Sequence, residues 1–181
     1  MEFIQTAIPD VILIKPTIIS DHRGYFMETY HIDKFNLKDM DITFVQDNHV
    51  KSVQNTLRGL HYQPKYPQAK LLRCCKGKVF DVAVDIRKDS TYFGQWVGCE
   101  LSEDNKYQLF IPEGFAHGYY VMSETAEIIY KCSEIFHPED QRGIIWNDQE
   151  IGINWPGGNP LLSVKDQRLP LFKNDCKSTN A

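Results

Sequence analysis

The chain has 181 residues, of which 42% are hydrophobic and 12% aromatic, and a formal net charge of −4 at pH 7. A chain of this length fits one domain that buries roughly 70% of its unfolded surface, and its hydrophobic content excludes a disordered protein. The acidic balance argues against a nucleic-acid-binding protein, which usually has a basic face, but it allows a basic pocket for a small anion.

Cysteine content and hydropathy predict a cytoplasmic protein without a membrane partner. The five cysteines are odd in number and include no C-x-x-C pair, and adjacent Cys74 and Cys75 should point to opposite faces of a strand. We therefore expect reduced thiols rather than disulfides or a zinc site. No apolar run approaches the ~18 residues of a membrane span, and the N-terminus lacks the basic start and apolar core of a signal peptide.

Short strands are predicted along the whole chain. The β-branched segment 11–19 is interrupted by Pro16 and therefore fits the edge of a sheet. The segment 78–87 alternates most clearly, with apolar side chains at positions 80, 82, 84 and 86. The other expected strands cover residues 42–50, 57–63, 69–75, 95–101, 107–112, 118–122 and 126–136.

Helical signals are few. Only residues 31–39 and 137–143 look like short helical turns. Many short strands without long helices favour an all-β sandwich or barrel over an α/β sheet. We expect a single domain over residues 1–172, followed by a polar C-terminal tail over residues 173–181.

The stretch TLRGLHYQPKYPQAK carries polar side chains within a predicted strand. Strict alternation puts Gly59, His61 and Gln63 on one face and Arg58 on the other. Such a polar face is typical of the lining of a cavity inside a barrel. A single histidine is more often structural than catalytic, but these companions and nearby Lys70 leave both roles of His61 open.

The segment IPEGFAHGYY contains the P-x-G-x-x-H pattern of the second cupin motif, in which His117 is the histidine. The first cupin motif normally supplies H-x-H and a glutamate, which bind a metal together with the later histidine. Here His61, Gln63 and Lys70 stand in those places, and an amide and an ammonium group disfavour a divalent cation. We expect a cupin-like barrel without a metal.

Two other segments carry side chains suited to a nucleotide, although each also has a structural explanation. Arg23, Phe26 and Glu28 bring together a guanidinium, a ring and a carboxylate, which suit a phosphate and a base, but a surface hairpin explains them as well. Lys165 and Asp166 lie in an apolar segment, where they could simply cap a packed tail.

Two strands add polar side chains to the candidate site. Gln46 and Asn48 place two amides on one strand face. Tyr130 is expected to share its face with Phe136.

The segments DHRGYF, VQDN, LRGLHYQ, KLLRCCKGKVFDVAVDIRKDS, IPEGFAHGYYV, YKCSEIFHPEDQRGIIWND, IGINWP and LSVKDQRLPLF occur in this order. Together they resemble the dTDP-4-dehydrorhamnose 3,5-epimerase family over most of the chain. The resemblance implies a cupin-type jelly-roll barrel with a few short helices and a homodimer that exchanges its N-terminal hairpin, residues 1–30. It also implies cofactor-independent conversion of dTDP-4-dehydro-6-deoxy-D-glucose to dTDP-4-dehydro-L-rhamnose, on the route to dTDP-L-rhamnose.

The resemblance also implies roles for individual residues. His61 matches the catalytic base, Tyr130 the catalytic acid and Asp166 the carboxylate paired with the base. Two residues match the lining of the sugar pocket, Lys70 and His117. Contacts to the nucleotide or its phosphates are matched by Arg23, Glu28, Gln46, Asn48, Arg58 and Lys165. The Arg23–Glu28 hairpin, which also carries the candidate ring of Phe26, is expected to come from the partner subunit.

Three positions leave questions open at this point. Phe136 falls where many family members carry a tyrosine that stacks on the thymine, and a phenylalanine ring can also stack. Strand alternation puts Arg58 opposite His61, which requires either a local bulge or a role at the subunit interface. Either Gln141 or Arg142 could make a contact that some members make nearby.

The sequence leaves three alternative functions to be compared with this one. A single 3- or 5-epimerase, or a 3,4-ketoisomerase, on a related nucleotide 4-keto sugar would use the same side chains. A non-catalytic cupin that binds sugar nucleotides would have no need of His61, Tyr130 and Asp166 together. A metal-dependent cupin dioxygenase would need the ligands that the first motif lacks.

Overall fold

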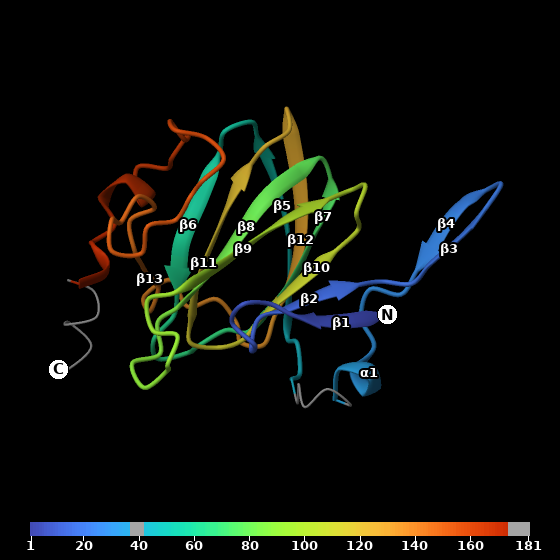
Figure 1. Cartoon of the computed structure of the whole chain (residues 1–181), viewed down its shortest axis with the longest axis horizontal. Coiled ribbons are helices and arrows are strands. Elements are labelled where there is room, and N and C mark those ends of the chain that lie inside the picture. Colours follow the sequence, from blue (N-terminus) through green and yellow to red (C-terminus); the bar gives the residue numbers. More distant parts are fainter. Residues whose placement is uncertain (37–41, 174–181) are drawn as a thin grey trace.

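The computed structural model describes residues 1–36 and 42–173, and two antiparallel sheets that form a barrel make up most of it (Figure 1). In order across the first sheet, the strands are β1 (Glu2–Gln5), β2 (Ile12–Lys15), β10 (Gln108–Ile111), β7 (Lys70–Lys76), β12 (Thr125–Cys132) and β5 (Gln46–Val53). The second sheet consists of β13 (Arg142–Gly143), β6 (Leu57–Tyr62), β11 (Phe115–Val121), β8 (Lys78–Asp85) and β9 (Trp96–Ser102). The predicted all-β barrel is confirmed.

Helices are short, as the sequence predicts. Helix α1 (Ile32–Asn36) occupies the start of the expected turn at 31–39, whose remainder lies largely outside the described residues. The segment 137–143 forms one hydrogen-bonded turn and then strand β13, which pairs with β6. A 3-10 turn, η1 (Asp166–Arg168), was not predicted. Within the described ranges, no helix is long and apolar enough to cross a membrane.

The described residues form three hydrophobic clusters, two of which lie on the two faces of β8. Between the sheets, Val79 and Ala83 of β8 pack in one cluster. On the outer side of the second sheet, Val82 and Val84 pack under the C-terminal segment. The alternation over 78–87 is therefore confirmed. Both faces of β8 are buried, because the first sheet covers one face and the C-terminal segment covers the other.

The prediction of a sheet edge at 11–19 is wrong for its first part, residues 12–15. Strand β2 ends at Lys15 and lies between β1 and β10, so that β1 forms the edge. Pro16 falls between β2 and the next strand, where its missing N–H removes no hydrogen bond from the sheet.

A separate hairpin projects away from the barrel (Figure 1). It consists of β3 (Ile18–Asp21) and β4 (Gly24–Met27), which pair only with each other among the described strands. Its side chains Ile19 and Phe26 are 64% and 68% exposed, unusually high for large apolar residues. The predicted tail, apart from residue 173, and Cys176 lie outside the described residues.

Candidate active site

A cavity of about 350 Å³ is lined by side chains from both sheets. Its volume lies in the range of ~300–1,000 Å³ that is typical of small-molecule sites. The structure brings ten predicted site residues together around it: Gln46, Asn48, Arg58, His61, Lys70, His117, Tyr130, Phe136, Lys165 and Asp166.

One wall of the cavity carries a short histidine–carboxylate pair. His61 on β6 lies with its Nε2 atom 2.6 Å from Oδ1 of Asp166, which begins the turn η1. Burial alone would raise the pKa of Asp166, but hydrogen bonds from His61, the Ser163 hydroxyl and the Gly59 main chain, together with the charge of His61, hold that pKa below its usual value. The carboxylate therefore stays ionised beside the imidazole.

A local bulge brings Arg58 to the same cavity as His61. In the pairing of β6 with β11, His61 lies opposite His117, whereas Arg58 lies opposite Tyr119. The stretch between these two pairs is therefore one residue longer in β6 than in β11. Such an extra residue breaks strict alternation and re-aims the side chains. A bulge in β6, one of the two explanations considered from the sequence, therefore accounts for Arg58 and His61 lining the same cavity. Within the chain, Nε of Arg58 donates to the Ser52 hydroxyl at 3.1 Å.

Gly59 makes the bulge possible. Its φ of +130° is a conformation that residues with a side chain rarely adopt. A Cβ atom there would lie 2.5 Å from Cα of Gly118 and 2.8 Å from the carbonyl oxygen of His117. The two strands that carry the cavity histidines can approach this closely only because residue 59 has no side chain.

A second histidine–carboxylate pair lies on the neighbouring strand. Nε2 of His117 on β11 lies 3.0 and 3.1 Å from the two carboxylate oxygens of Asp81, which is fully buried on β8. Asp81 holds the imidazole of His117 in place against the cavity.

The opposite wall supplies a phenol and an ammonium group. Tyr130 on β12 is part of the first sheet, whereas His61 belongs to the second, and both line the cavity. Burial raises the pKa of Tyr130 to about 12, so the phenol keeps its proton at neutral pH. Burial also lowers the pKa of Lys70 on β7, although the nearby Cys132 and Asp81 oppose this shift.

Amide groups extend the site along β5 towards a loop. Gln46 donates to the side-chain oxygen of Asn48 at 3.0 Å and accepts a hydrogen bond from the main chain of Phe136 at 2.8 Å. Strand β12 ends at Cys132, so Phe136 reaches the cavity from a loop and not from the strand face that it was expected to share with Tyr130. At the far rim, Lys165 donates to the side chain of Gln141.

Comparisons with known proteins agree on one family. The family model described as dTDP-4-dehydrorhamnose 3,5-epimerase matches residues 5–174. The enzyme of that name from Salmonella typhimurium is 53% identical over 175 residues, 95% of this chain and 96% of the relative. This chain belongs to the dTDP-4-dehydrorhamnose 3,5-epimerase family.

A solved structure of the family supports the fold as well. The 3,5-epimerase of Legionella pneumophila, in complex with dTDP-4-keto-L-rhamnose, is 45% identical, with a TM-score of 0.93 over 95% of this chain and 93% of that one. A more distant relative, 36% identical over 85% of this chain and 75% of its own length, is the dTDP-4-dehydrorhamnose 3-epimerase of Streptomyces niveus.

Three predicted residues of this family member do not line the cavity of their own chain. Arg23, Phe26 and Glu28 lie on the projecting hairpin or directly after it. There Arg23 pairs with Asp21 at 2.7 Å, and Glu28 accepts a hydrogen bond from Lys34 at 2.5 Å.

Other cavity residues of this epimerase family member were not singled out from the sequence. They are Val50, Tyr62, Gln68, Tyr119, Cys132 and Ser163. Gln141, and not Arg142, takes part in the lining. A signal for Asp81 was available, since a carboxylate within an otherwise apolar, buried strand needs a partner.

Proposed function

We propose that this protein is a dTDP-4-dehydrorhamnose 3,5-epimerase that converts dTDP-4-dehydro-6-deoxy-D-glucose to dTDP-4-dehydro-L-rhamnose without a cofactor. One observation carries the proposal: the His61–Asp166 pair and the protonated phenol of Tyr130 line one cavity from two different sheets. The names of the relatives and the keto sugar bound by the Legionella pneumophila enzyme support the same conclusion.

The chemistry requires a base and an acid on opposite faces of a sugar. C3 and C5 both lie next to the C4 carbonyl, so removal of either proton gives an enolate. We assign His61 as the base, because an imidazole has a reference pKa near 6.5 and can accept a proton at neutral pH. Asp166 binds one ring nitrogen, which orients the ring and stabilises the imidazolium that forms at the other.

Tyr130 is the proposed acid. Its raised pKa of about 12 keeps the phenol protonated and ready to donate to the face opposite His61. Proton return on the opposite face inverts the carbon, whereas return from His61 restores the starting sugar. Lys70 is the proposed stabiliser of negative charge on O4, an electrostatic role that is often the largest catalytic contribution. His117, held by Asp81, contributes to the sugar pocket.

The nucleotide is assigned to the amide and cationic side chains of the cavity. Gln46, Asn48, Arg58 and Lys165 supply hydrogen-bond donors for the diphosphate and base, and Phe136 supplies a ring for stacking. We further propose a homodimer in which Arg23, Phe26 and Glu28 reach the partner's cavity. The projecting hairpin and its exposed apolar side chains support this exchange.

The donor set of the cavity favours chemistry without a metal. Lys70 presents an ammonium group at a position where cupin metal sites have ligands. The amide nitrogen of Gln63 donates to the main-chain oxygens of Tyr66 and Ile135, and its oxygen accepts from the main chain of His137. The amide of Gln63 is thus used to hold the loops at residues 66 and 135–137 and does not serve as a metal ligand.

The cellular location and the kind of partner can be inferred from the cysteines and the net charge. We propose a cytoplasmic protein, because the free thiols of Cys74 and Cys75 suit a reducing compartment. Its net charge of −4 is consistent with a small-molecule substrate and with the absence of nucleic-acid and membrane partners.

One experiment tests the reaction and its regiochemistry. The protein is incubated with dTDP-4-dehydro-6-deoxy-D-glucose in D₂O, with and without a 4-ketoreductase, and the products are examined by NMR. Deuterium at both C3 and C5, with an L-rhamnose product after reduction, is the expected result. Deuterium and inversion at a single carbon would instead identify a 3- or 5-epimerase, as the Streptomyces niveus relative is named. Movement of the carbonyl to C3 would identify a 3,4-ketoisomerase, and no exchange would refute the proposal.

A further inference from the structure

The outer face of the first sheet carries a second cluster of reactive side chains, separate from the cavity. His49 on β5, Cys75 on β7 and Glu127 on β12 come from three adjacent strands, because β12 pairs with β5 on one side and with β7 on the other. Asn48 and Tyr130 point into the cavity. Strand alternation therefore turns His49 and Glu127 to the opposite face.

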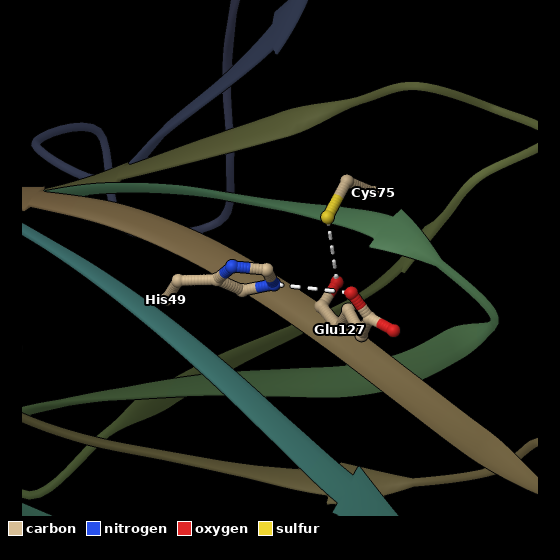
Figure 2. A group of neighbouring side chains, drawn as sticks. All are labelled: His49, Cys75 and Glu127. Atoms are coloured by element: carbon tan, nitrogen blue, oxygen red, sulfur yellow. Dashed lines mark hydrogen bonds and ion pairs between the residues drawn. The ribbon is translucent and has the colours of Figure 1, made fainter.

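The three side chains point toward one another (Figure 2). Nε2 of His49 lies 3.1 Å from Oε2 of Glu127, and the Cys75 thiol donates to the main-chain oxygen of Glu127 at 3.3 Å. One imidazole nitrogen, the sulfur and one carboxylate oxygen all lie within 4.8 Å of one another.

The local pairing of β7 with β12 explains why Cys75 belongs to this group. Ile128 lies opposite Cys74 but Glu127 lies opposite Lys76, so Cys75 is the extra residue of a register shift. Bulges of this kind re-aim a side chain, and here the thiol is brought beside Glu127.

We propose that His49, Cys75 and Glu127 bind a Zn²⁺ ion or a similar borderline divalent cation, which departs from the sequence-based expectation that the cysteines form no zinc site. Thiolate, imidazole and carboxylate are the three ligand types of protein zinc sites, at about 2.0–2.3 Å from the metal. A tetrahedral ion with such bonds separates its ligand atoms by about 3.3–3.8 Å. Small side-chain rotations suffice to reach this geometry, because the His49 side chain is 58% exposed and free to adjust.

Charge balance is compatible with the ion. On binding, the thiol of Cys75 releases its proton to solvent and no electron moves. The thiolate and the Glu127 carboxylate then offset the two positive charges of the cation. Lys51 and Lys76, which lie opposite Glu127 on the two neighbouring strands, add positive charge nearby. A water molecule completes the fourth position.

The ion would join three strands behind the cavity wall. Strands β5, β7 and β12 carry Asn48, Lys70 and Tyr130 on their inner faces. The site therefore stabilises this wall without touching the substrate. Zn²⁺ is expected to raise the melting temperature, while turnover does not require it.

Metal titration of the full-length, chelator-treated protein tests the site. Zn²⁺ is added in competition with a chromophoric chelator, and Co²⁺ is added separately as a spectroscopic probe. We expect one Zn²⁺ per chain and a thiolate-to-cobalt charge-transfer band in the near ultraviolet. Cys75→Ser should abolish the band, and His49→Gln or Glu127→Gln should weaken Zn²⁺ binding by more than about tenfold, as even outer-shell changes can.

Cys99→Ser is the matched control. Cys99 is a free thiol on β9, outside the cluster, so this variant should keep the band and the affinity. The proposal is overturned if the wild-type protein binds Zn²⁺ no better than Cys75→Ser, or if the band survives in Cys75→Ser. The readout is independent of epimerase activity, so failure of the proposed reaction would leave it intact.

Discussion

The 2.6 Å contact between His61 and Asp166 leaves one imidazole nitrogen for proton transfer. Replacement of His61 by alanine should strongly reduce deuterium incorporation at both C3 and C5, because the proposed mechanism uses one base for both carbons. A proton-transfer partner typically contributes about 10²–10⁴-fold, and the loss in rate should fall in that range. Proton NMR in D₂O measures the exchange, and full exchange in the variant would exclude His61 as the base.

Tyr130 should affect the outcome of exchange more than exchange itself. Tyr130→Phe removes the hydroxyl whose pKa of about 12 keeps it protonated, but it leaves the ring and its packing. We expect the variant to exchange the substrate protons while inversion falls by about 10²–10⁴-fold. The ratio of wash-in to epimerised product is the measurement. An unchanged ratio together with an unchanged rate would exclude Tyr130 as the acid.

The two pKa shifts on this wall predict which group limits activity at high pH. The pKa of Lys70 is lowered by burial and that of Tyr130 is raised, so Lys70 loses its proton first as the pH rises. Lys70→Arg should move the alkaline limb of the kcat profile to higher pH, because a guanidinium keeps its charge. Tyr130→Phe should leave that limb in place. A limb that moves only in Tyr130→Phe would reverse the assignment.

At the scale of the strands, the β6–β11 bulge depends on the absence of a side chain at residue 59. Gly59→Ala should destabilise the fold by about 1–3 kcal/mol and lower activity, since the added Cβ collides with the main chain of β11. Gly24→Ala is the matched control: its φ of +131° is nearly the same, but no atom lies within 4 Å of the added Cβ. Denaturant titration of both variants separates the clash from the backbone strain. Equal losses would show that packing against β11 is unimportant.

The sequence was most informative where a strand keeps its alternation. Residues 78–87 alternate because both faces of β8 pack, and Gln46 and Asn48 share a face because β5 is regular up to the cavity. Alternation failed at Arg58, because a bulge depends on how two strands meet and not on either strand alone. The same limit hid Cys75, which reaches Glu127 only through a register shift.

At the scale of the whole molecule, the motifs of the family located most of the cavity residues. The side chains that support those residues are brought to them only when the strands pair into the barrel. His117 and His61 were visible in two motifs. Asp81 became a partner of His117 only when β8 and β11 aligned in one sheet. No local pattern encodes that alignment, because it is set by long-range pairing.

The proposed exchange of the hairpin between subunits can be tested by mixing two inactive proteins. One carries His61→Ala and the other Arg23→Ala, and random reassortment of subunits makes half of the dimers mixed. If Arg23 serves the partner's cavity, one of the two sites in each mixed dimer has both residues intact. Activity should then recover to about a quarter of the wild-type value, as expected for subunits that exchange freely between symmetric dimers.

If Arg23 instead serves its own chain, no site in the mixture has both residues, and activity stays at the level of the separate variants. Size-exclusion chromatography establishes that dimers form, and tagged subunits establish that they exchange. Lys70→Ala replaces Arg23→Ala in the control mixture, because Lys70 and His61 line the cavity of the same chain and no site in a mixed dimer then has both residues intact. Recovery that appears only with the hairpin variant would tie the projecting β3–β4 unit to catalysis in the neighbouring subunit.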